Sequence, residues 1–346
     1  MTLTFKKGHI YLHTTLSEQL LNLLGEKGKL NDQTLSIFNS SNTRLGKVTL
    51  QNAKNLSRKG LKVLQQHHIV DLEAAELTVT VSDLISSLSE WTIENLRSLS
   101  VSDCTFVDSS KVAVMVSLSK LRNLRNLNVS YTEFNNHGLE IIVEDLRHLE
   151  CLDLSETRVS EISPLRKCRN RLRALVMHNL KISDAAIPVI LDLPRLKHLD
   201  VSRNSNFSSR FQQQVYVLLD HITPPLSLSV NELLLEQGAL RELEHLDISG
   251  CDRVDIDALT QFIQCHRSLR FLGLLDCEAC YESVFAEKNG SFATLLVVRN
   301  ALKNCISISM ILLHFPSGHR IGQRGTDSRV PYSLSKAHQI HPKVIV

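Results

Sequence analysis

One phrase recurs along most of this chain. The stretch LECLDLSETRV, from Leu149, places leucine at its first, fourth and sixth positions, with polar residues between. The same apolar spacing occurs nine times at successive intervals of 23 to 28 residues, with one interval of 47. Copies in register at such a period indicate stacked repeats. They begin at Leu45, Ile69, Leu96, Leu124, Leu149, Leu172, Leu196, Leu243 and Leu269.

The spacing predicts a short strand in each copy. In the copy that begins at Leu149, Leu152 and Leu154 alternate as on one face of a strand, and Leu149 packs from the turn before. A single copy cannot bury its apolar face, so neighbouring copies must stack. The intervals fall close to the range of about 20–29 residues that is typical of leucine-rich repeats. The sequence therefore predicts an α/β leucine-rich-repeat solenoid with a parallel sheet on its concave side.

The segments between the copies predict the helical side. Residues 137–146 and 257–266 carry apolar residues at helical spacing. In SPLRKC, Ser163 is predicted to cap a short helix with Pro164 at its first position. Residues 229–243, within the long interval, also look helical.

The ends of the chain differ from the repeats. We expect a helical N-terminal cap over residues 1–44, with an amphipathic helix that ends near Gly25. Leucine-rich repeats follow over 45–290, and a terminal helix over 291–305. Residues 306–346 have little apolar content and no periodicity, which predicts an irregular, disordered basic tail. The tail has a net charge of +4, which leaves −1 for the body. That balance argues against nucleic acid or membrane lipid as partners.

The concave face is the predicted contact surface. Strand alternation directs the third, fifth and seventh residues of each copy to solvent. The row Asp153, Asp200 and Asp247 either attracts a basic partner or keeps the face soluble. The candidate partner-binding residues are Cys151, Asp153, Ala174, Val176, His198, Asp200, His245, Asp247 and Phe271.

A cysteine cluster offers a different chemistry. Cys251, Cys265, His266, Cys277 and Cys280 include the C-x-x-C of CEAC, which has the ligand types of a zinc site. The competing interpretation is structural. Cys251 and Cys277, like Cys104, are the ninth residue of their copies, where such repeats use Asn or Cys to bond the turn. No catalytic or phosphate-binding motif occurs, so we expect no enzyme activity, cofactor or metal.

No secretory leader or membrane span is evident in the sequence. Eight cysteines without a tight framework are typical of thiols in a reducing compartment. These features predict an intracellular protein of the cytoplasm or the nucleus.

Several phrases resemble the leucine-rich half of the Zyg-eleven and Zer family. They are LNDQTLSIF (30–38), LKVLQQHHIVDLEA (61–74), LRALVMHNLKI from Leu172 and LRFLGLLDCEACYESVF from Leu269. The resemblance covers roughly Leu30 to Cys305. It implies a substrate receptor of cullin-RING ubiquitin ligases of the cullin-2 type. The family's parts are an N-terminal box that binds elongin C and cullin, the repeats, and an armadillo-like array that reads glycine degrons.

The chain departs from that pattern at both ends. TLSEQLLNLL has box-like spacing at Thr15, Leu16, Leu20 and Leu24, but Leu20 replaces the usual cysteine, and we interpret the segment as the repeat cap. The tail stands where the armadillo-like array is expected, so the chain resembles a truncated form. The resemblance implies a non-catalytic substrate receptor that positions target proteins. The alternative is a free-standing interaction scaffold without a ligase.

Overall fold

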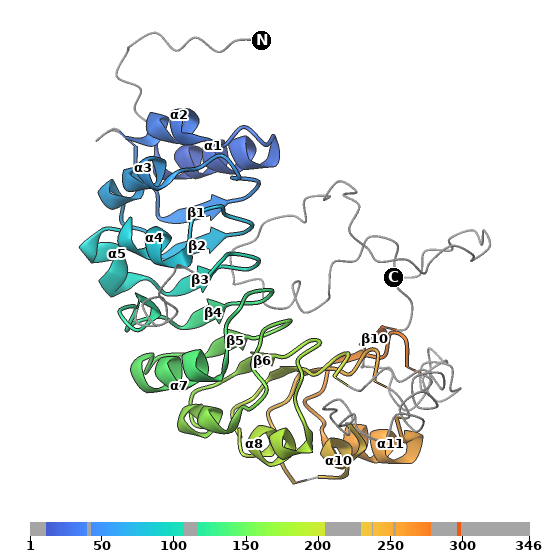
Figure 1. Ribbon diagram of the computed structural model, residues 1–346. Helices are drawn as coiled ribbons and strands as arrows, with labels where there is room; N and C mark the ends of the chain where they lie inside the picture. The colour runs from blue at the N-terminus through green and yellow to red at the C-terminus, as the bar shows by residue number, and fades with distance from the viewer. Residues whose placement is uncertain are drawn as a thin grey trace, which may run out of the picture.

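The computed structural model contains one continuous parallel sheet. It describes residues 12–39, 43–106, 117–204, 230–236, 238–251 and 254–277, and the backbone of 296–298. Ten strands lie in chain order, each paired with the next, along the inside of an arc with helices on its outside (Figure 1). The predicted leucine-rich-repeat solenoid is confirmed. The strands are β1 (Lys47–Leu50), β2 (Asp71–Ala74), β3 (Ser98–Ser100), β4 (Asn126–Asn128), β5 (Cys151–Asp153), β6 (Ala174–Val176), β7 (His198–Asp200), β8 (His245–Asp247), β9 (Phe271–Gly273) and β10 (Leu296–Val298).

Short helices cover the convex side and alternate with the strands. Those predicted over 137–146 and 257–266 are present as α7 and α11, and both begin at a side-chain cap, Asn135 or Asp255. The described α-helices are α1 (Thr14–Glu26), α2 (Asp32–Leu35), α3 (Arg58–Leu61), α4 (Val81–Ser86), α5 (Glu90–Asn95), α7 (Asn136–Asp145), α8 (Ile187–Leu191), α10 (Val230–Leu235) and α11 (Ile256–Cys265). The 3-10 turns are η1 (Ser36–Phe38), η2 (Lys62–Gln66), η3 (Ser163–Cys168) and η4 (Asp184–Ala186).

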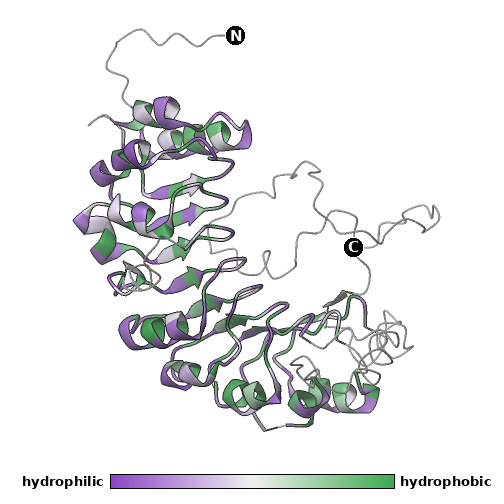
Figure 2. Ribbon diagram, viewed as in Figure 1, coloured by the Kyte–Doolittle hydropathy of each residue, from purple (hydrophilic) through white to green (hydrophobic). Residues whose placement is uncertain are grey.

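The core is the ladder of apolar residues that defines the repeat. In all nine copies the first, fourth and sixth residues are at most 6% exposed. Helices that show both hydrophobic and hydrophilic colours in Figure 2 place their apolar residues, such as Leu139 and Ile142 of α7, in the same core. Burying one leucine is worth about 2 kcal/mol, so stability accumulates along the array through contacts between neighbouring copies.

Each copy turns away from the sheet through one left-handed residue. The eighth residue of every copy has a positive φ, between 48° and 66°, and only Gly250 is glycine. This conformation lets its N–H donate to the next copy, as Tyr131 does to the Ser155 carbonyl at 2.9 Å and Asn179 to Ser202 at 2.9 Å. The interstrand ladder thus continues beyond the short strands. The other members are Asn52, Glu76, Asp103, Glu156, Arg203 and Asp276.

Helix α1 packs against the first strand. Leu21 is fully buried against the core. Glu18 Oε1 accepts hydrogen bonds from the N–H groups of Gly46 (3.0 Å) and Lys47 (2.8 Å). The carboxylate therefore satisfies backbone donors at the start of β1.

Some sequence expectations differ from the structure. The terminal helix predicted over 291–305 is wrong at residues 296–298, which form β10 and pair with β9. The Leu-Val-Val sequence favours a strand where a sheet edge is open for pairing. Ser163 is the first residue of η3 and makes no capping bond. Helix α10 is shorter than predicted, because it ends at Leu235. The predicted tail, 306–346, lies outside the described residues.

Candidate partner-binding face

The nine candidate residues form two neighbouring ladders across β5 to β9. The strand register pairs Cys151 with Ala174, then His198, His245 and Phe271. Two residues further along each strand, the second ladder runs Asp153, Val176, Asp200, Asp247 and Gly273. We call these the aromatic ladder and the acidic ladder. The sequence period therefore placed these residues together correctly.

Their burial differs from the expectation of a solvent-facing surface. Cys151, His198 and His245 are half-buried. The other six candidates are buried, each at most 8% exposed. On a sheet of short, closely stacked strands, each side chain is covered by its neighbours on the adjoining strands. The surface open to a partner is therefore narrow and lies around the two histidines.

The acidic ladder belongs to the turns. Asp153 Oδ1 accepts from the Ser155 N–H at 2.9 Å and from its hydroxyl at 2.6 Å. The Asp200 and Asp247 side chains accept the N–H groups of Ser202 and Ser249 in the same way, at 2.8 and 2.9 Å. The D-x-S phrase is thus an Asx turn at the ends of β5, β7 and β8. This role differs from both roles that the sequence left open for the aspartates.

Burial changes the acidity of these carboxyls. It raises the pKa of Asp153 to about 6, against the lowering effect of the Ser155 hydrogen bonds. Burial, followed by the charge of Asp200, also raises the pKa of Asp247 to about 6. Both carboxyls therefore titrate close to neutral pH.

The aromatic ladder is centred on a pair of stacked imidazoles. The rings of His198 and His245 lie 4.2 Å apart at 20°, and Phe271 follows His245 at 5.9 Å. Burial, and then His245, lowers the pKa of His198 to about 4. Burial likewise lowers the pKa of His245. At neutral pH both rings are uncharged and present a continuous aromatic surface.

The absence of a side chain on Gly273 leaves room for the carboxyl of Asp247. A Cβ on Gly273 would lie 2.3 Å from Asp247 Oδ1 and 2.5 Å from its Cγ. The Asp247 carboxyl therefore occupies the space where a side chain on β9 would be. This explains why the acidic ladder ends at a glycine.

Two further residues extend the face beyond the sequence prediction. His178 Nδ1 lies 2.7 Å from the Ser202 hydroxyl, next to the acidic ladder. Tyr131, at a left-handed turn position, is 51% exposed. The sequence could have indicated Tyr131 as a surface contact residue, because it is a large aromatic residue at the eighth position, where most copies have a polar residue.

The cysteines support the structural interpretation of their spacing. The thiols of Cys104, Cys251 and Cys277 lie within 3.0 to 3.7 Å of the carbonyls of Ala74, Val201 and Ile248. His266 has its two ring nitrogens 2.7 Å from the Phe262 carbonyl and 2.9 Å from the Ala239 carbonyl. Across the described residues, no three His, Cys, Asp or Glu side chains converge as metal ligands. Cys280 lies outside the described residues.

Comparison with known proteins shows which repeat proteins this chain is similar to. The family model for Zer-1-like leucine-rich repeats matches residues 140–229. The human protein zer-1 homolog is 28% identical over 147 residues, which cover 41% of this chain. The repeats are therefore similar to those of the Zyg-eleven/Zer family. The mouse zer-1 homolog is 24% identical over 274 residues, 72% of this chain, and Zyg eleven-related protein 1 of Caenorhabditis elegans is 28% identical over 167 residues, 42% of this chain.

The match covers only part of these Zyg-eleven/Zer relatives. The aligned region spans 19% of the human protein, 33% of the mouse protein and 17% of the worm protein. Among solved structures, internalin C2 from Listeria monocytogenes is 19% identical, with a TM-score of 0.42 over 78% of this chain and 92% of that chain. That score is too low for any argument about function. None of the described helices has the length and apolar character needed to cross a membrane.

Proposed function

We propose that this chain is a non-catalytic substrate-recognition component of a cullin-RING ubiquitin ligase. Its repeats would hold a target protein, while other subunits carry out ubiquitin transfer. The proposal combines the Zyg-eleven/Zer relationship of the repeats with the character of the concave face. We propose an intracellular location for the complex, with elongin C and cullin-2 as the ligase partners.

The observation that carries the proposal is the aromatic ladder. Five side chains from five successive strands, Cys151 to Phe271, lie in register and carry no charge at neutral pH. The half-buried His198 and His245 at the centre of this stripe, beside polar turns, suit a small contact with a protein segment. Burial raises the pKa of the Cys151 thiol to about 11, so this thiol is a poor nucleophile. The chemistry of the face favours binding over catalysis.

Affinity capture from cell lysate tests the proposal. The full chain should recover elongin C and cullin-2, together with further proteins that the His198→Ala/His245→Ala double variant recovers less well. His137→Ala, at a 62% exposed position on α7, should match the unsubstituted chain. If folded chain recovers neither elongin C nor cullin-2, the ligase assignment is wrong and the free-standing scaffold takes its place.

A further inference from the structure

The strands begin at a strongly basic surface. Three positions flank the buried first residue of each copy: the two before it and the one after it. In the seven copies that start from Leu96 to Leu269, these 21 positions hold eleven Arg or Lys and four Glu. We call them the basic rim. The basic members are Arg97, Arg122, Arg125, Arg147, Arg171, Arg173, Arg195, Lys197, Arg241, Arg267 and Arg270.

The charge of the basic rim exceeds that of the whole protein. Its net charge is +7, whereas the full chain carries +3, so all other residues together carry −4. A nearly neutral total therefore conceals two regions of opposite sign. Since strands in one sheet lie about 4.8 Å apart, seven strands give the rim a length of about 29 Å.

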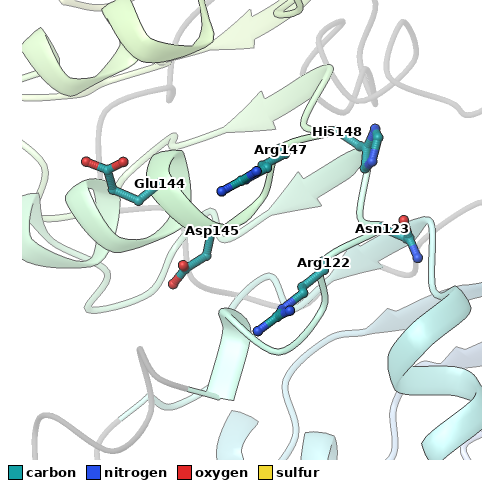
Figure 3. A pocket seen from close by; sticks show the side chains of 6 residues that line it. All are labelled: Arg122, Asn123, Glu144, Asp145, Arg147 and His148. Carbon is teal, nitrogen blue, oxygen red and sulfur yellow. The ribbon is translucent and has the colours of Figure 1, made fainter.

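Part of the basic rim is open for a partner. Arg97, Arg122, Arg147 and Arg267 are exposed, and none of them has an ion pair with another described residue. Two of these arginines line a hollow of about 390 Å³ between the copies that start at Leu124 and Leu149. Figure 3 shows both projecting on the same side, with Asp145 between them. The lining is Arg122, Asn123, Glu144, Asp145, Arg147 and His148.

Glutamates divide the basic rim into separate cationic positions. Glu150 lies 3.0 Å from Arg125 and 3.5 Å from Arg173, and Glu244 lies 2.7 Å from Lys197. A nucleic acid backbone, with a phosphate at every nucleotide, would bring phosphates against these carboxylates. A protein segment can place its acidic side chains at the arginines and other residues at the glutamates.

We propose that the basic rim binds an extended acidic segment of a partner protein. The segment runs across the strand starts, and its carboxylates pair with Arg122 and Arg147 at the hollow. The basic rim is a second surface, separate from the concave ladders, and the proposal does not depend on ligase membership. Electrostatic complementarity of this kind governs both association rate and orientation.

Fluorescence anisotropy on the full chain tests the proposal with a labelled peptide of about eight residues in which glutamate alternates with serine. In extended form it spans about 26 Å and leaves uncharged residues to face the glutamates of the basic rim. The chain should bind this peptide at low salt and lose affinity as salt is added. Arg122→Glu/Arg147→Glu should weaken binding about tenfold or more. The matched control is Arg158→Glu/Lys181→Glu, which makes the same charge change at two exposed residues beyond the opposite ends of the strands.

A third variant should change peptide affinity in the opposite direction. Glu150→Gln frees Arg125 and Arg173 from their shared partner and should tighten peptide binding about threefold, an effect that misfolding would not produce. Equal losses in the two double variants would overturn the assignment to the basic rim, as would no detectable binding by the folded chain. Tighter binding of a thymidine oligonucleotide of equal charge would overturn the choice of a protein partner.

Discussion

His198 and His245 lie face to face on adjacent strands, with their ring centroids 4.2 Å apart. The two residues are 47 positions apart in sequence, because the long interval between copies separates β7 from β8. The contact therefore reports directly on whether the array closes correctly across that interval. It also makes the pair sensitive to pH.

Replacing His198 should change how stability depends on pH. The pKa of His198 is about 4 in the folded chain, against 6.5 for a histidine free of its surroundings. Between these values the unfolded chain binds the additional proton, so stability is lost as pH falls below about 6.5. In His198→Phe the free energy of unfolding should fall less from about pH 7.5 to 5 than in the unsubstituted chain, by about 1 kcal/mol.

The acidic ladder works in the opposite direction within the same pH range. Asp153 and Asp247 have raised pKa values of about 6, so their contribution is present at low pH and is lost as pH rises through 6. The hydrogen bond from Lys197 lowers the pKa of Glu244, next to the histidines, so this carboxylate stays charged over the range. Urea unfolding at each pH compares His198→Phe with the unsubstituted chain. Because both proteins contain the aspartates, the contribution of the aspartates to the pH dependence cancels in the difference. Parallel pH curves for the two proteins would contradict the prediction.

Asp153→Asn and Asp153→Ala should have different effects. The amide keeps an acceptor for the Ser155 N–H and hydroxyl and removes a buried charge, so Asn should be neutral or stabilising near pH 7.5. Alanine removes the acceptor and should cost about 1–3 kcal/mol. Thermal or urea unfolding of the two variants measures the difference. Equal losses would mean that the carboxyl charge, and not the Asx turn, holds the strand end.

Gly273→Ala should destabilise the chain through one side chain. Its Cβ would lie 2.3 Å from Asp247 Oδ1, and overpacking of this size costs about 1–3 kcal/mol. In an Asp247→Ala background the contact is absent, so the added cost of Gly273→Ala should largely disappear. A double-mutant cycle by urea unfolding gives the coupling energy. A cost that is unchanged in that background would point to backbone strain as its cause.

Tyr131→Gly should stabilise the chain by about 1 kcal/mol, since glycine adopts the left-handed conformation without steric cost. Tyr131→Val should destabilise it, because a β-branched residue fits that conformation poorly. Gly250→Ala provides the complementary control, at the turn that already has glycine. Unfolding midpoints rank the variants. A destabilising Tyr131→Gly would show that the tyrosine ring contributes more through packing than its backbone costs.

The repeat period of the sequence predicted the features that recur in every copy, such as the position of each strand. Strand positions and the convex helices follow from the spacing of residues such as Leu152 and Leu139, whose burial the pattern requires. The turn bonds of Cys104, Cys251 and Cys277 followed from their shared position.

Features that the sequence did not predict depend on contacts between residues that lie far apart in the chain. Asp153 looks exposed on its own strand, yet it lies between Asn128 and Val176 of the adjoining strands and is 6% exposed. The stacking of His198 on His245 requires the register of two copies across the long interval. Strand β10 has no repeat phrase and forms by pairing with β9. Alternation within one strand cannot reveal these effects.

The left-handed turn residue also has a use in comparing the copies of the repeat. None of the nine is β-branched, and their side chains range from Gly250 to Tyr131, so the position constrains backbone shape and leaves side-chain identity largely open. It marks the phase of each copy independently of the leucines. Alignments of the copies within this chain can therefore be anchored on this position. Exchanges there among Asn, Asp and Gly should be scored as conservation of geometry and given no weight as evidence of a binding site.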